Sequence, residues 1–161
     1  MAEKVFSLNF ASVVATFTPK KSGIQPVVLK ADVFWTDDQM LSEPTPDKER
    51  AKYFASNDGK TGQYIDMFAK SGKRDCMLMD SINTEKLIAW AMSNPQPLFD
   101  FSFFYLRNDA DQSEARTQLH TNCKFLTHPA RIPSNDVVSI RFNFQYANLD
   151  TLDANGVPIT L

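Results

Sequence analysis

The chain has 161 residues, of which 43% are hydrophobic and 22% are charged. This length suits one domain, residues 1–161, with one core, and the composition excludes an intrinsically disordered chain. The formal net charge of −2 argues against a protein that grips nucleic acid, and no apolar run approaches the roughly 20 residues of a membrane helix, so no membrane partner is expected.

The first half of the chain contains short apolar runs bounded by polar residues. They predict strands over residues 5–10, 13–17, 27–35 and 76–79. Residues 20–23, Lys-Lys-Ser-Gly, predict the tip of a hairpin. Residues 1–10 lack the apolar centre of a signal peptide, so we expect synthesis in the cytoplasm.

Residues 36–62 differ from the rest of this half, because they combine Pro44 and Pro46 with mixed charges and few apolar side chains. The pattern predicts a long polar loop, and a loop of this length in a compact domain is usually functional or disordered. Residues 58–61, Asp-Gly-Lys-Thr, resemble the end of a phosphate-binding loop. The glycine that this motif requires five positions before Gly59 is Phe54, so a hairpin turn is the preferred interpretation.

One helix is predicted, over residues 84–93. Asn83 or Thr84 caps its start, Glu85 lies in the first turn, where the helix dipole favours an acid, and Pro95 ends it. The helix is short and has to be held by packing against a sheet. The side chains expected to be buried there are Leu87, Ile88 and Trp90.

The second half has the strongest strand signals. Residues 98–106 form an aromatic-rich strand, and residues 115–127 and 136–148 alternate apolar and polar side chains with a period of two. The last two segments are predicted to pair antiparallel, and residues 150–161 form a C-terminal tail. The fold class is therefore mainly β, with sheets that form a sandwich or barrel, one short packed helix and one long polar loop.

Some residues are of types that bind metals. His120, Cys123 and His128 qualify, but His120 and Cys123 are an odd number of residues apart, so an unbulged strand points them to opposite faces. We therefore expect solvated histidines. Cys76 and Cys123 are expected to be buried free thiols, although a disulfide between them stays open.

Other chemical motifs are incomplete. Asp109, Asp111 and Glu114 lack the glycine and the distal glutamate of a calcium loop, and no nucleophile elbow or carboxylate pair is evident. The sequence therefore predicts no catalytic residue, no cofactor and no metal, and the chain is not expected to be an enzyme.

The order of elements, and above all residues 83–150, resembles the tail tube proteins of contractile-tailed bacteriophages and the related haemolysin-coregulated protein of type VI secretion. A helix over 84–93 precedes strands over 98–106 and 119–127. The stretch from Ala130 to Asp150 then resembles the closing segment of tube proteins, in which a proline-bearing turn leads into an alternating strand. The first 82 residues match only in general layout.

The resemblance implies a structural subunit of a virion tail. Copies of it form a hexameric ring, and rings stack into a tube that conducts DNA during infection. The partners implied are the chain itself and the sheath, baseplate and terminator proteins, with transient passage of DNA. The alternative interpretation is a small β-barrel module that binds a ligand or an oligonucleotide.

Two sets of residues are candidates for roles in such a tube. The polar faces of the two alternating strands suit a wet channel, with Asp32 or Asp100 expected to neutralise the cations on them. The candidate lumen-facing residues are Gln118, His120, Asn122, Lys124, Ser139, Arg141, Asn143 and Gln145. The charged loop is expected to make contacts between subunits through Asp37, Asp38, Glu43, Asp47, Lys48, Glu49, Arg50 and Lys52.

Overall fold

The alternating segments of the sequence form strands, and the mainly β prediction is confirmed. The computed structural model describes residues 8–33, 41–48, 52–55, 62–65, 68–107, 112–129, 131–133 and 138–159. The strands in this part of the chain are β1 (Leu8–Pro19), β2 (Val27–Lys30), β3 (Thr45–Lys48), β4 (Lys52–Ala55), β5 (Gly62–Ile65), β6 (Phe68–Met79), β7 (Phe99–Arg107), β8 (Ala115–Phe125), β9 (Arg131–Pro133), β10 (Val138–Tyr146) and β11 (Asn148–Leu152). The helical segments are α1 (Ile82–Met92) and the 3-10 turns η1 (Ala31–Val33) and η2 (Gln112–Glu114).

Antiparallel pairing joins nine of these strands in the order β2-β1-β7-β8-β10-β6-β3, with β11 on β8 and β9 on β10. The predicted hairpin at residues 20–23 is confirmed, because β1 and β2 pair on either side of it and Gly23 has φ of 86°. The predicted pairing of the two alternating strands is also confirmed, but it covers only two residue pairs, Phe144↔Phe125 and Gln145↔Lys124. The earlier part of β8 pairs with β11 instead.

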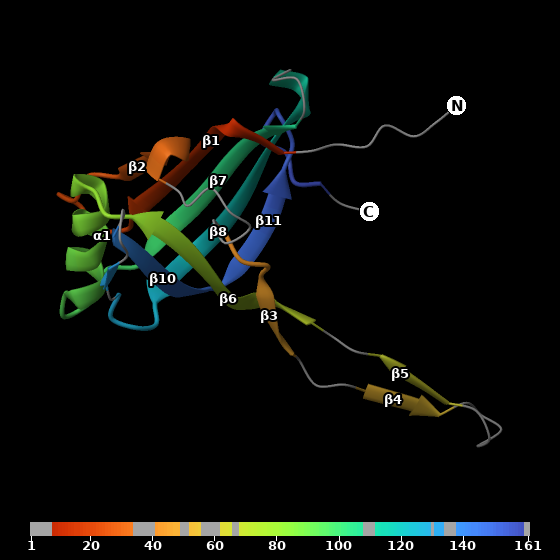
Figure 1. The fold of residues 1–161 in the computed structure, drawn as a ribbon. Helices are drawn as coiled ribbons and strands as arrows, with labels where there is room; N and C mark the ends of the chain where they lie inside the picture. Colours follow the sequence, from red (N-terminus) through yellow and green to blue (C-terminus); the bar gives the residue numbers. More distant parts are fainter. Residues whose placement is uncertain are drawn as a thin grey trace.

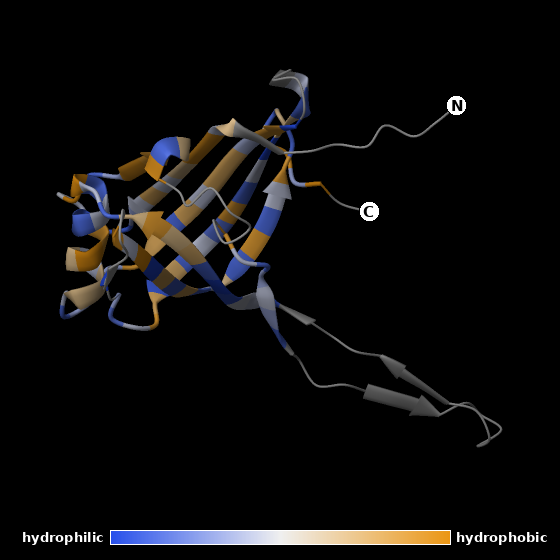
Figure 2. Cartoon of the chain, viewed as in Figure 1, coloured by the Kyte–Doolittle hydropathy of each residue, from blue (hydrophilic) through white to orange (hydrophobic). Residues whose placement is uncertain are grey.

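The core lies between two layers, β2-β1-β7-β8-β11 on one side and β10-β6 on the other (Figure 1). Apolar and polar residues alternate along these strands, so that one face of each is apolar (Figure 2). Phenylalanines from both layers meet inside, and the ring centroids of Phe101 and Phe144 are 5.2 Å apart. Cys76 and Cys123 are buried and free, and burial raises the pKa of each thiol to about 12, so both are unreactive.

The predicted helix is present as α1, which begins two residues earlier than expected and lies beside β2 at one end of the layers (Figure 1). Its cap is Ser81 rather than Asn83 or Thr84. The Ser81 hydroxyl accepts a hydrogen bond from the Thr84 amide at 3.2 Å, and Thr84 is buried, with its hydroxyl donating to the Met79 carbonyl. Leu87 and Trp90 are buried as predicted, whereas Ile88 is only partly buried.

The segment expected to be a loop contains strands. β3 and the start of β6 pair through Thr45↔Lys73, Pro46↔Gly72 and Lys48↔Phe68, and β4 pairs with β5 in a separate two-stranded sheet. These pieces form a projection that leads away from the two layers (Figure 1). We call it the arm: β3, β4, β5 and residues 68–71 of β6. The loop prediction failed because a ladder between strands needs no apolar face when the strands project from the core.

Two ends of segments also differ from expectation. Residues 150–152, expected to begin the C-terminal tail, belong to β11, and a turn after it returns so that the Ile159 amide donates to the Thr151 carbonyl. The strand expected over residues 27–35 ends at Lys30, and η1 begins at Ala31. None of the helices in the described ranges has both the length and the apolar character needed to cross a membrane.

Candidate assembly site

A bulge in β8 decides which side chains of this strand face the core. Asn122 has φ of 52°, and the β7–β8 register shifts between the pairs Phe99↔Cys123 and Phe101↔His120. An extra residue reverses the inside-outside alternation. His120 and Cys123 are therefore both buried, with exposures of 0%, and the expectations that they lie on opposite faces and that His120 is solvated are wrong.

Asn122 suits this bulge because asparagine tolerates a left-handed backbone better than most residues. Asn122→Gly is expected to leave the free energy of unfolding nearly unchanged, whereas Asn122→Val should lower it by about 1–2 kcal/mol. Urea unfolding measures both, with Thr121→Val as the control for a β-branched residue at the neighbouring position. Equal stability of Asn122→Val and the wild type would contradict the inferred strain.

A buried polar cluster links the two layers on the inner side of β6 and β8. Arg74 of β6 is 7% exposed. Its Nε donates to the Ser42 carbonyl at 2.7 Å, and its Nη1 lies 2.6 Å from Gln118 Oε1 and 3.0 Å from His120 Nε2. Within the described part of the chain, Arg74 has no carboxylate partner, so its hydrogen-bond acceptors there are all neutral.

His120 is held as a neutral ring in this cluster. Its Nδ1 lies 3.1 Å from the Phe101 carbonyl and donates to it, which leaves Nε2 to accept from Arg74. Burial, with the positive charge of Arg74, lowers the pKa of His120 from 6.5 to about 4. Burial also lowers the pKa of Arg74 to about 10, so the guanidinium stays charged at neutral pH.

The candidate lumen-facing residues divide into two groups. His120 is buried and Ser139 is 9% exposed, so neither faces solvent in the subunit, and Gln118 is half-buried and bonded to Arg74. The others lie on the outer face of β10 and the last part of β8: Asn122, Lys124, Arg141 and Gln145, which are exposed, and Asn143, which is half-buried.

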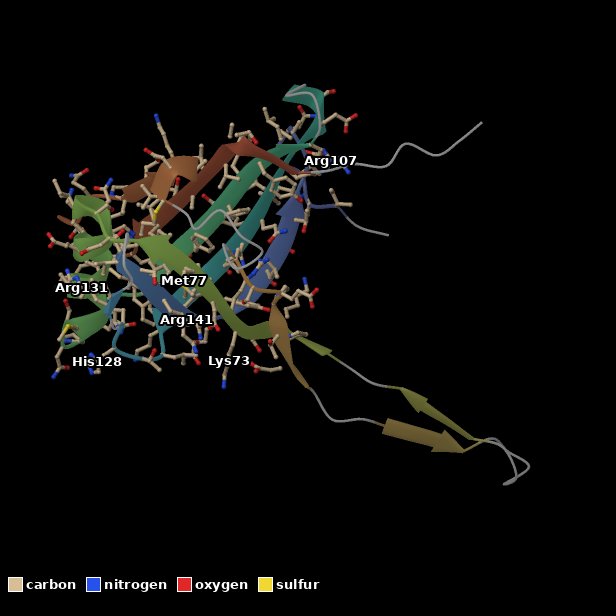
Figure 3. The ribbon with its side chains drawn as sticks, viewed as in Figure 1. Lys73, Met77, Arg107, His128, Arg131 and Arg141 are labelled. Atoms are coloured by element: carbon tan, nitrogen blue, oxygen red, sulfur yellow. The ribbon has the colours of Figure 1, made fainter. Side chains whose placement is uncertain are left out.

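Lys73 and Met77 of β6 belong to the same outer face, since they pair with Gln145 and Arg141 of β10 (Figure 3). Asp100, expected to neutralise cations on this face, lies 3.4 Å from Lys20 instead. Asp32 is exposed in η1 and forms no ion pair with another described residue. The outer face of β6 and β10 therefore carries the exposed cations Lys73 and Arg141, with Asp75 as the acid between them, and Lys124 of β8 lies beside it as the partner of Gln145.

The base of the arm is fixed beside the buried cluster. The Ser42 amide donates to the Asp75 carbonyl at 2.9 Å, and the Asp75 amide donates to the Ser42 hydroxyl at 2.9 Å. A Cβ built on Gly72 would lie 2.6 Å from the Thr45 carbonyl oxygen and 2.8 Å from Pro46 Cα. Glycine therefore lets β3 approach β6 closely at this point.

The predicted inter-subunit residues lie on or near the arm where the structure describes them. Glu43 and Asp47 are exposed, and the Ser71 hydroxyl donates to Asp47 at 3.0 Å. Lys48 is the last residue of β3 and Lys52 the first of β4. Asp37, Asp38, Glu49 and Arg50 lie outside the described residues, as does the turn at residues 58–61.

The described residues hold no metal cluster, and the hollow that they form beside the arm base is open. They contain no group of three or more histidine, cysteine or acidic side chains placed to hold a metal ion. Glu114, one of the three acids considered for calcium, pairs with Arg107 at 3.0 Å, and Asp109 and Asp111 are not described. An open hollow of about 290 Å³ beside the arm base is lined by Ser42, Glu43, Thr45, Lys73, Arg74, Asp75 and Asn143. It is open and lined by polar and charged residues, unlike the enclosed apolar pockets that bind small molecules.

Comparison with known proteins supports the resemblance at the level of the fold. No protein-family model and no curated protein sequence matches the chain. A solved structure of the anti-feeding prophage (AFP) baseplate contains a similar chain, with a TM-score of 0.62 and 11% identity over 96% of this chain and 99% of that one.

Other solved structures agree. A chain in the sheath-tube complex of the extracellular contractile injection system PVC gives a TM-score of 0.58 and 12% identity, with 89% of each chain covered. A chain in the AFP tube-terminating cap gives a TM-score of 0.58 and 10% identity, with 95% of each chain covered. The chain has the fold of these injection-system proteins. The agreement spans nearly the whole length, so the first 82 residues share the fold as well as residues 83–150.

Proposed function

We propose that this protein is a structural subunit of a contractile tail or injection machine, and that its copies form hexameric rings that stack into a tube for DNA. The observation that carries the proposal is the shared fold over 96% of the chain with a component of a six-fold symmetrised baseplate structure. Its partners would be further copies of itself and the sheath, baseplate and terminator proteins. The finished assembly would be a virion tail, made in the host cytoplasm.

The strand arrangement supports assembly through sheet edges. β2 and β3 end the path of the large sheet, and each has a ladder partner on one side only among the described residues. Exposed edges invite pairing with another chain, and closing a barrel of several copies removes them. The ligand-binding alternative has less support, because the exposed large apolar side chains are all aliphatic among the residues for which the structure gives a side-chain exposure, and a base would stack on an aromatic ring.

Purified protein is expected to form rings or tubes without added metal or cofactor. Size-exclusion chromatography followed by negative-stain electron microscopy tests this directly. A protein that remains a monomer at micromolar concentration, with no ring in any micrograph, would contradict the proposal.

Within such a tube, the outer face of β6 and β10 is our candidate for the channel wall. Arg141→Cys and Gln145→Cys provide thiols on this face, while the native thiols are buried and unreactive. In intact tubes, a maleimide too large for the channel should fail to label either site, although a small maleimide labels both. Isolated subunits, in which both reagents should react, are the control. Labelling of tubes by the large reagent would place this face outside.

A further inference from the structure

The direction of the arm depends on a small number of contacts at its base. Among the described residues, β4 and β5 pair only with each other, so they contribute no ladder to the body. The connection runs through β3, whose ladder with β6 covers three residue pairs and contains an irregularity between Pro46 and Lys48. A short, irregular ladder on a projecting hairpin is weak by itself. The contacts just before β3 therefore matter most.

Those contacts meet at Ser42. Its amide and hydroxyl both bond to the Asp75 backbone, and Leu41 forms an isolated bridge with Cys76. Its carbonyl accepts from Arg74 Nε at 2.7 Å. The Arg74 side chain is the one that continues inward, to Gln118 and His120 of β8. A single guanidinium thus ties the segment leading into the arm to both layers of the core.

Burying a cation to make these contacts carries a large unfavourable free energy of desolvation. Removing a guanidinium from water costs several kcal/mol unless an ion pair compensates, and the described residues supply only neutral acceptors. An apolar side chain would fill the same space at lower cost. What the guanidinium adds is a planar set of donors that fixes three acceptors in set directions. The guanidinium therefore contributes a defined geometry of the three acceptors rather than additional stability.

We propose that Arg74 is a positioning residue for the arm: it fixes Ser42 relative to β8, and through Ser42 it sets the direction in which the arm leaves the body to meet a second copy of this chain. Gly72 provides an independent second constraint by allowing β3 to lie against β6. The inference that a second copy receives the arm rests on the proposed function, whereas the fixing of Ser42 concerns the isolated subunit.

Hydrogen exchange at the Ser42 and Asp75 amides tests the fixing of Ser42 in isolated subunits, read by mass spectrometry. In Arg74→Met, which replaces the cation with an apolar chain of similar length, exchange should accelerate about tenfold or more, because a hydrogen bond to a charged group is lost. Arg74→Lys keeps the charge without the planar guanidinium, so its exchange rates should lie between those of the wild type and of Arg74→Met. Lys86→Met, which removes an exposed cation on α1 and leaves the arm base unchanged, should exchange as the wild type does.

Tube assembly tests the second part of the inference. Arg74→Met should form rings but few or short stacks, and Gly72→Ala, which pushes β3 away without changing a charge, should have the same defect. Lys86→Met should form tubes of wild-type length. If circular dichroism shows that Arg74→Met does not fold, Arg74→Lys replaces it in both the hydrogen-exchange and the tube-assembly experiments.

Wild-type exchange at Ser42 and Asp75 in the folded Arg74 variant would overturn the positioning role. Accelerated exchange with tubes of normal length would overturn the link between arm direction and stacking. If the wild-type protein itself forms no tubes, the proposed function fails, and the exchange rates of the isolated subunits still decide the role of Arg74.

Discussion

Replacing Leu87 with alanine is expected to lower the free energy of unfolding by about 2–5 kcal/mol. Leu87 is 0% exposed on the inner face of α1, beside the buried Trp90 and Ala91. Its truncation removes apolar contact and leaves a cavity where the helix closes one end of the two layers. Because α1 is an 11-residue helix, it depends on this packing rather than on its own propensity.

Urea unfolding followed by tryptophan fluorescence and circular dichroism measures the change. Ile82→Ala is the matched control, since Ile82 lies on the same helix and is 77% exposed, so its truncation should change stability by less than about 0.5 kcal/mol. If the two variants lost the same free energy, the inner face of α1 would not be part of the core.

Lowering the pH from about 6.5 to about 4 is expected to remove about 3 kcal/mol of stability through His120 alone. The pKa of His120 is about 4 in the folded protein, against 6.5 for an unperturbed histidine. The unfolded chain therefore binds the proton more tightly. The stabilisation is complete above pH 6.5, and it is lost progressively as the pH falls toward 4.

The cause lies in the groups that face the His120 ring. Arg74 of β6 is a cation at 3.0 Å from Nε2, and a proton on that nitrogen would both remove the acceptor and add a second buried positive charge. Tyr146 of β10 packs edge-on at 5.3 Å and is neutral throughout this range, since burial raises its pKa further. Neither neighbour compensates the added charge.

Comparison with His120→Gln isolates this contribution, because glutamine offers an acceptor and a donor but does not titrate in this range. Unfolding free energies at several pH values between 7.5 and 4 should show a steeper fall for the wild type than for the variant, while the carboxylates act equally on both. His128→Gln, at an exposed position, should follow the wild type. Parallel curves for the wild type and His120→Gln would refute the buried neutral ring.

Much of the fold could be predicted from the periodicity of apolar side chains and from the residues that begin and end each segment. The alternation in residues 136–148 predicts β10, and its outward side chains at Arg141 and Gln145 are where the period places them. The helix was predictable from its capping region and apolar face, with an error of a few residues at its start because Ser81 competes with Asn83 and Thr84 as a cap. Arg74 also carried a signal: it shares the inward parity of Cys76 and Leu78 on β6, which marks it as a buried cation.

The sequence by itself determined the mainly β class, the strand faces of β10 and the buried face of α1, since these follow from local periodicity of polar and apolar side chains. Only the tertiary structure decided the facing of His120 and Gln118, because one residue at a left-handed φ, Asn122, reverses the parity of β8. Only the tertiary structure likewise decided the position of the arm and the partners of Arg74. Residues 41–48 and 68–79 come together through long-range pairing, and the three acceptors of Arg74 are 32, 44 and 46 residues away in the chain.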